Sequence, residues 1–306
     1  MKKTLSTILL GAGLFAGSLI YSGCNKNSQD HQEKLKTEQN TETIRVDFLN
    51  DFAYKTWQEN SKKAFEILDS AQKSAEFLNY EKGITDALIR RGVIHYFQGD
   101  YESAKENYSK YLEIKKNIKD SLGMGKAYNN LGAISNAQGR NEEAVQYYIK
   151  YLKICEKLQD SIGIAQAYNN IGQVFDKQNK NEIALEYFDK SLDIKKNLND
   201  SLGISQTLNN IALIFDKQNK NELALIHYFN SLKIANKIKN KSQEASCYNN
   251  IAVIYNKEGD LDKAFEYYQK SLKIGEELGD KEGLILDFIF KNSFYFNSNF
   301  KFSKFF

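Results

Sequence analysis

Apolar residues recur along most of this chain at the spacing of an amphipathic helix. In one stretch they occupy one helical face at i, i+3, i+4, i+7, i+8 and i+11, namely Ala144, Tyr147, Tyr148, Tyr151, Leu152 and Cys155. A shorter stretch before it places Tyr128, Leu131 and Ile134 at steps of three. The pattern predicts two successive helices, each with one buried face.

Residues that end helices separate the two halves of each such pair. Glycine or asparagine, which tolerate the left-handed conformation, stand at Gly99, Gly139, Asn179, Asn219 and Gly259. Candidate N-caps follow at Asp100, Asn141, Asn181, Asn221 and Asp260. Between pairs, the same signal comes from Asp120-Ser121, Asp160-Ser161 and Asp200-Ser201. Each pair is therefore predicted to form a helical hairpin.

The hairpins repeat every 40 residues. Small residues recur at Gly92, Gly132, Gly172, Ala212 and Ala252, and alanines follow at Ala104, Ala144, Ala184, Ala224 and Ala264. Aromatic residues come next, at Tyr108, Tyr148, Phe188, Tyr228 and Tyr268. Ala64 and Leu68 continue the series backwards into a diverged first unit at 44–79. Because one hairpin cannot bury its apolar face alone, the units are expected to stack.

The recurring set A-Y-N-N-[LI]-G, then [GN], then A-x3-[YF]-x3-L resembles the tetratricopeptide repeat. The similarity is to the longer form of the repeat that kinesin light chains contain. It covers five units, at 80–119, 120–159, 160–199, 200–239 and 240–279. The chain departs from the family in having no proline, and in having tyrosine or serine where a small alanine is common, at Tyr111, Tyr151, Ser191, Ser231 and Ser271. The resemblance implies an all-α fold, a right-handed superhelical α-solenoid.

Paired asparagines stand in the middle of four predicted first helices, although asparagine is a poor helix former. The resemblance implies that the first helices line a concave face that binds an extended peptide, gripped by a ladder of amides at Asn130, Asn170, Asn210 and Asn250, with Arg90 at the same place one unit earlier. An amide suits this role because it both donates to and accepts from a peptide backbone. Further polar residues of that face are Gln173, Asp176, Lys177, Asp216, Lys217, Asn256 and Lys257. Alternatively, the amide columns tie each helix to the next unit.

The N-terminus has the pattern of a secretory signal peptide. A basic MKK start precedes an apolar run, and Ser22-Gly23 before Cys24 resembles the lipobox of bacterial lipoproteins. We expect residues 1–23 to be removed and Cys24 to carry a lipid, followed by a polar tether at 24–43. Asn25 in place of a retention aspartate favours the outer membrane of a bacterial cell envelope. The alternative is a secreted protein with a free cysteine.

The composition and the absence of known motifs argue against nucleic-acid binding, metal binding and catalysis by this chain. A net charge of +3 gives no electrostatic case for nucleic-acid binding. The three histidines, His31, His95 and His227, lie far apart, and three scattered cysteines make no metal cage. No phosphate-binding loop, nucleophile elbow or H-E-x-x-H motif occurs. We therefore expect no cofactor, no metal and no catalytic residues.

The repeat register fails near Leu286. Residues 280–306 form an incomplete repeat and an aromatic-rich end, FIFKNSFYFNSNFKFSKFF. A docked β-prone tail and an interfacial anchor are two explanations. The interpretation that we favour is that this end is read out of frame, which would make the natural protein longer.

The function expected from the sequence is a non-catalytic scaffold at the cell envelope that binds a peptide or partner protein in the concave groove. The alternative is a sensory input region severed from a signalling protein, either a histidine kinase or a helix-turn-helix regulator. An enzyme is the third and least favoured class.

Overall fold

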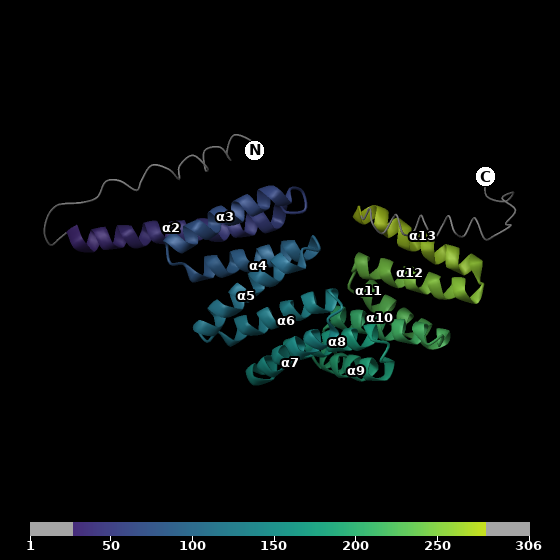
Figure 1. Cartoon of the computed structure of the whole chain (residues 1–306). Helices are drawn as coiled ribbons and strands as arrows, with labels where there is room; N and C mark the ends of the chain where they lie inside the picture. The colour runs from purple at the N-terminus through teal and green to yellow at the C-terminus, as the bar shows by residue number, and fades with distance from the viewer. Residues whose placement is uncertain (1–26, 280–306) are drawn as a thin grey trace. The chain divides into compact units, whose positions relative to one another are not determined.

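The computed structural model describes residues 27–279, with side chains from residue 39 onward. Within that range it contains twelve α-helices and no strand (Figure 1). The chain divides into two compact units, with the boundary after Arg91.

The first unit contains α2 (Asn27–Thr56), α3 (Ser61–Phe77) and most of α4 (Glu81–Phe97). Val46 of α2 and Ala71 and Ala75 of α3 form a fully buried core, with Tyr80 and Ile84 packed against it. The sequence led us to expect an unfolded tether up to residue 43, but α2 begins at Asn27. A polar segment joined directly to a packed helix can extend that helix without a hydrophobic face of its own, because nucleation is already complete.

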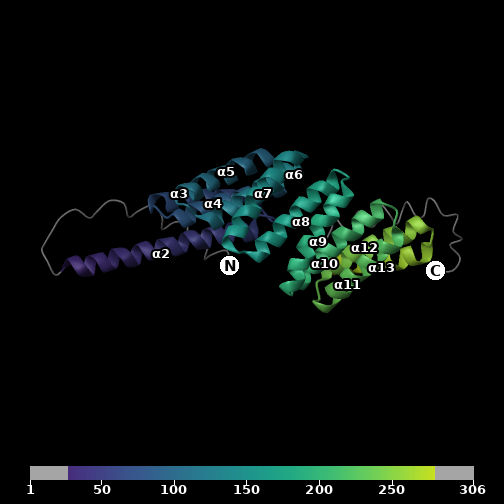
Figure 2. The same ribbon diagram turned by 90° about the horizontal axis from the view of Figure 1, so that it is seen from below.

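The second unit continues as consecutive hairpins (Figure 2). It starts with the last residues of α4 and with α5 (Tyr101–Asn117), and then pairs α6 (Ser121–Ala137) with α7 (Asn141–Leu158). The later pairs are α8 (Ser161–Lys177) with α9 (Asn181–Asn197), α10 (Ser201–Lys217) with α11 (Asn221–Lys237), and α12 (Lys241–Glu258) with α13 (Leu261–Leu278). The prediction of stacked helical hairpins, an all-α solenoid, is confirmed.

Every turn between helices from α3 to α13, and the turn after α13, contains one left-handed residue. These residues fall 20 positions apart from residue 79 to residue 279, with φ between 51° and 80°. The expected breakers Gly99, Gly139, Asn179, Asn219 and Gly259 are among them, as are the lysines Lys119 and Lys239. Turn geometry therefore repeats twice per unit whatever the residue type.

The N-caps follow the prediction only in part. Asp100 and Asp260 cap their helices, and Asp120, Asp160 and Asp200 accept the N–H three residues later at 2.9–3.0 Å. The prediction was wrong for Asn141, Asn181 and Asn221, which are the first residues of their helices. Their N-caps are Arg140, Lys180 and Lys220, none of which makes a side-chain capping bond. Each of these helices begins two residues after the left-handed position, so the cap lies one residue earlier than the polar pattern indicates.

Small residues allow the two helices of each hairpin to pack closely. A Cβ added at Gly132 would lie 2.6 Å from a ring carbon of Tyr148, which is 2% exposed.

The serines that stand where the family commonly has a small alanine form hydrogen bonds with the neighbouring helix. Ser191 donates to the carbonyl of Ala165, Ser231 to that of Ser205 and Ser271 to that of Ala245, at 2.7–3.0 Å. These serines hydrogen-bond the first helix of the hairpin at a place where alanine would only pack.

Candidate functional site

The polar residues of each first helix form two edges separated by a central position. In α8, Asn169 and Asp176 are seven residues apart, close to two helical turns, and therefore share one edge. Asn170 and Lys177 share the other edge for the same reason, and Gln173 lies between the two. The repeat places the same two edges on α10 and α12.

Neighbouring first helices are joined edge to edge by amide hydrogen bonds. Asn170 Nδ2 donates to Asn129 Oδ1 at 2.8 Å, Asn210 Nδ2 to Asn169 Oδ1 at 3.2 Å, and Asn250 Nδ2 to Asn209 Oδ1 at 3.0 Å. All six side chains are only partly buried. Three of the four predicted amides thus spend one N–H on the preceding hairpin. Asn130, the fourth, is also partly buried. The residue 41 positions before it is Ile89, whose side chain has no hydrogen-bond acceptor.

A second row of bonds joins the same helices near their C-terminal ends. Lys217 Nζ lies 2.7 Å from Asp176 Oδ1, and Lys257 Nζ lies 2.5 Å from Asp216 Oδ1. Lys177 donates to the carbonyl oxygen of Asn136 at 3.2 Å, because asparagine replaces the aspartate in that unit. The predicted lysines and aspartates therefore pair with one another from unit to unit. We call each amide or lysine bond between consecutive first helices a rung.

The remaining predicted residues occupy different environments. Gln173 is partly buried between the two edges, and Asn256 is exposed near the end of α12. Arg90, in the first unit, forms an ion pair with Asp51 and stacks over the ring of Tyr54 at 5.3 Å. Cys24 lies outside the described residues.

Sequence reasoning missed one member of the asparagine column. Asn50 stands 40 residues before Arg90; it is fully buried, and its Nδ2 donates to the carbonyl of Gly83 at 3.0 Å. Extending the 40-residue count back into the diverged unit would have identified it. The acceptor role of Asn129, Asn169 and Asn209 was also missed, because the spacing alone does not show which edge faces the next hairpin.

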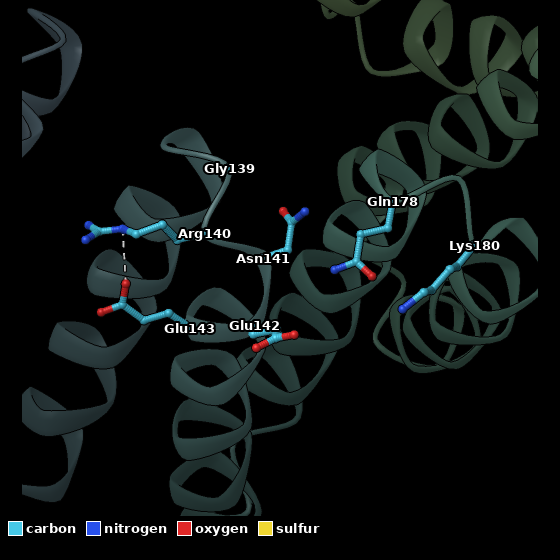
Figure 3. Close-up of a pocket in the computed structure, with 7 residues that line it drawn as sticks. All are labelled: Gly139, Arg140, Asn141, Glu142, Glu143, Gln178 and Lys180. Carbon is cyan, nitrogen blue, oxygen red and sulfur yellow. Dashed lines mark ion pairs between the residues drawn. The ribbon is translucent and has the colours of Figure 1, made fainter.

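A hollow of about 560 Å³ lies where two hairpin turns meet (Figure 3). Its walls are the start of α7 and the turn between α8 and α9, contributed by Gly139, Arg140, Asn141, Glu142, Glu143, Gln178 and Lys180. Arg140 Nε is held 3.1 Å from Glu143 Oε2, while the buried Oδ1 of Asn141 has no hydrogen-bond partner within the described structure. The charged groups are of both signs, so the hollow has no marked preference for an anion or a cation.

Burial shifts the pKa of several titratable groups in the described part of the chain. Burial raises the pKa of the Cys155 and Cys247 thiols, which keeps them protonated and unreactive at neutral pH. Desolvation lowers the pKa of His227, which stacks on Phe215 at 5.4 Å. Among the side chains that the structure describes, from residue 39 to residue 279, no group of three His, Cys, Asp or Glu is placed to hold a metal ion. None of the helices in the described part is long and apolar enough to cross a membrane.

Comparison of known folds places this arrangement among repeat proteins. BtubC (BKLC) from P. vanneervenii superposes with a TM-score of 0.54 at 15% identity, covering 80% of this chain and 93% of that one. The Rap conjugation gene regulator of plasmid pLS20, in complex with the Phr* peptide, gives 0.66 at 13% identity over 84% of this chain and 81% of that one. NprR in complex with its cognate peptide NprX gives 0.63 at 14% identity, covering 97% and 81%. At these identities the likeness shows the fold alone.

Family models define the repeats themselves. Models described as tetratricopeptide repeat match residues 85–118, 123–197 and 203–277, which together make up more than half of the chain. No curated protein sequence matches the chain. The three matched segments cover most of the helices from α4 to α13 and all the residues that form the rungs. The chain therefore belongs to the tetratricopeptide repeat family.

Proposed function

We propose that this protein is a non-catalytic scaffold that binds an extended peptide, or an extended segment of a partner protein, along the face formed by its first helices. The observation that carries this proposal is the double row of rungs on α6, α8, α10 and α12. Three amide bonds and three lysine bonds keep consecutive first helices in register. A surface whose polar groups repeat once per unit is suited to a ligand whose backbone groups also repeat.

The amides retain hydrogen-bonding capacity after forming the rungs. Asn170 uses one of its two N–H groups, and among the described residues no other side-chain bond engages it. Its carbonyl oxygen and second N–H remain to pair with a peptide N–H and a peptide carbonyl. The same holds for Asn210 and Asn250. Each amide can therefore be oriented by its neighbour and still bind backbone, so the structural and ligand roles are compatible.

Peptide complexes among similar folds support the choice of ligand. The structures of the Rap regulator of pLS20 and of NprR were each solved in complex with a peptide. By analogy of fold, we assign an extended peptide to the first-helix face here. Asn130 and Gln173 would contribute at its first two units, and the mixed charges of Asp176, Lys217 and Lys257 favour a ligand of low net charge.

We further propose that the scaffold operates at the bacterial cell envelope, held by a lipid on Cys24. The support is the sequence alone: a basic start, an apolar run and a small pair before the cysteine. The second candidate function, an input region of a longer signalling protein, rests on the loss of repeat register near Leu286. Reading the DNA beyond codon 286 in the other two frames separates the candidates.

A random linear-peptide display library, selected on the immobilised full chain, tests the binding face. The test variant is Gln173→Arg, which places a long charged side chain at the central position of α8 without removing a rung. The matched control, Asp193→Arg, changes an exposed residue of α9. We expect enriched peptides to bind the test variant at least tenfold more weakly, with an unchanged melting temperature, and to bind the control normally. Equal binding by both variants would refute the proposal.

A second pair of substitutions tests the asparagine amides that form the rungs. Asn170→Ala with Asn210→Ala removes two rungs, and we expect weaker peptide capture together with a melting temperature lower by a few degrees. Unchanged capture with a lowered melting temperature would assign those amides to the structural role alone.

A further inference from the structure

The hollow at the hairpin turns is lined by two opposite charges that are not paired (Figure 3). Arg140 and Glu143 pair with each other at 3.1 Å, so together they add no net charge. Glu142, in the first turn of α7, and Lys180, the N-cap of α9, form no ion pair with each other or with another described residue. Both side chains are exposed. The hollow therefore has one free carboxylate and one free ammonium on its walls.

A third polar side chain of the hollow is also without a partner. Gln178 and Lys180 extend from the turn after α8 towards the side of the hollow that α7 forms (Figure 3). The Gln178 side chain forms no hydrogen bond with another described residue. Its amide can donate to a carboxylate or accept from an ammonium. Lys180 Nζ lies 5.7 Å from the centroid of the Phe175 ring, a contact that restricts where the ammonium can lie.

One hairpin earlier, the residues of the same three columns are bonded to one another. Gln138 Nε2 donates to Glu102 Oε1 at 3.1 Å, and Arg140, in the column of Lys180, donates to Gln138. Forty residues later the three corresponding side chains make none of these bonds. The repeat can therefore close this junction with its own side chains. The open junction departs from that arrangement and leaves three polar groups available to a ligand.

We propose that the hollow binds a small zwitterion, a molecule with one ammonium and one carboxylate, such as a dipeptide with free ends. The Glu142 carboxylate accepts from the ligand ammonium, and the Lys180 ammonium donates to the ligand carboxylate. The Gln178 amide adds a donor and an acceptor. Because Glu142 and Lys180 do not reach each other, the ligand has to separate its own two charges, which favours a dipeptide over a single amino acid. The volume of about 560 Å³ has room for one.

Charge balance selects this class of ligand. A simple anion would leave Glu142 unpaired and repel it, and a simple cation would do the same to Lys180. A zwitterion satisfies both groups at once. The hollow lies at the hairpin turns and shares no residue with the rungs, so the site is independent of peptide binding along the first helices.

A titration of the full chain with diglycine, followed by ligand-observed saturation-transfer NMR, tests the ligand class. The comparison ligands are N-acetyl-diglycine, which has no ammonium, and diglycinamide, which has no carboxylate. We expect saturable binding of diglycine and about fivefold weaker binding of each comparison ligand, because one exposed ion pair contributes little in water. Equal binding of the three ligands, or no saturable binding of diglycine, would overturn the proposal.

Substitutions on the wall of the hollow test the residues. Lys180→Gln and Glu142→Gln should each weaken diglycine binding about fivefold. The matched controls are Lys220→Gln and Glu182→Gln, which lie in the same columns one hairpin later and do not line the hollow. Lys220 lies 5.9 Å from a phenylalanine ring, much as Lys180 does, so the two lysine variants lose the same packing contact. The controls should bind as wild type does, and all four melting temperatures should match. Equal weakening by Lys180→Gln and Lys220→Gln would contradict the assignment.

A third comparison separates the hollow from the face formed by the first helices. Gln173→Arg alters that face, and we expect it to bind diglycine as wild type does. Diglycine binding that is lost in Gln173→Arg but kept in Lys180→Gln would place the ligand on the first helices and overturn the inference.

Discussion

Asn210 donates from Nδ2 to Asn169 Oδ1 at 3.2 Å, across two helices that belong to different hairpins. Both asparagines lie mid-helix, where their intrinsic propensity is unfavourable. The hydrogen bond between hairpins explains how a poor helix former can nevertheless support the stack.

Removing amide rungs should therefore destabilise the stack. Each partly buried amide bond contributes about 1 kcal/mol, so Asn170→Ala with Asn210→Ala should lower the free energy of unfolding by about 2 kcal/mol. Part of this loss will be offset by the better helix propensity of alanine. Urea denaturation measures the change. Asn236→Ala, an exposed asparagine on α11, is the control and should change stability by less than about 0.5 kcal/mol. Equal effects in the two variants would show that the rungs contribute nothing.

The glycine notch of the α6–α7 hairpin predicts a steric effect. In Gly132→Val, the new side chain would overlap the ring of Tyr148, which is only 2% exposed. We expect overpacking to lower the free energy of unfolding by about 2–3 kcal/mol. This loss is larger than the stabilisation that replacing a glycine inside a helix would otherwise give. Thermal unfolding checks the size of the loss. Gly139→Val is unsuitable as a control because of its positive φ, so Ala133→Val, partly buried on the same helix, serves instead.

The uncapped second helices predict a stabilising change. Lys220 is the N-cap of α11 and makes no side-chain capping bond, whereas Asp260 accepts the N–H of Lys263 at the equivalent place in α13. Lys220→Asp should therefore raise the free energy of unfolding by about 1 kcal/mol. The reciprocal change, Asp260→Lys, should lower it by a similar amount. A melting temperature that falls in Lys220→Asp would show that the contact between Lys220 and the Phe215 ring, at 5.9 Å, matters more than the cap.

His227 predicts a pH dependence of stability. Desolvation lowers its pKa in the folded protein, and nearby Asp189 only partly opposes this. The unfolded chain then binds more protons than the folded one, so stability should fall as pH drops below about 6.5 and continue falling to the lower pKa of the folded state. His227→Tyr restores the residue that Tyr147, Tyr187 and Tyr267 provide in other units, and should remove this part of the slope. Urea denaturation between pH 5 and pH 8 measures both. The same slope in both proteins would exclude His227 as its source.

Much of the fold follows from spacing alone. The 40-residue recurrence of Gly132, Ala144 and Tyr148 predicts the hairpin and the notch because helix packing depends on side-chain size at fixed positions. The caps were less predictable. Arg140 became the N-cap in place of Asn141 because the left-handed residue at 139 fixes where the next helix starts, and a polar pattern does not resolve one residue.

The candidate site was harder to predict than the fold. The sequence identified the Asn170 and Lys217 columns as polar, but it did not show that each pairs with a residue 41 positions earlier. That offset depends on how adjacent helices turn relative to each other, which no single helix determines. The exposed apolar residues of α11 were also overlooked, because Ile226 and Phe229 fit a helical pattern in any case and only their exposure distinguishes them.

The left-handed residue that returns at every twentieth position sets a rule for how this chain can change its length. Adding or deleting a few residues inside a first helix would rotate the asparagine or lysine beyond that point away from its counterparts, and the rungs that this helix makes with its two neighbours would be lost. Adding or removing one complete 40-residue unit would leave each junction as it was. Evolution and protein engineering can therefore lengthen or shorten this protein in whole hairpins, and the length of the face formed by its first helices would change by one fixed increment each time.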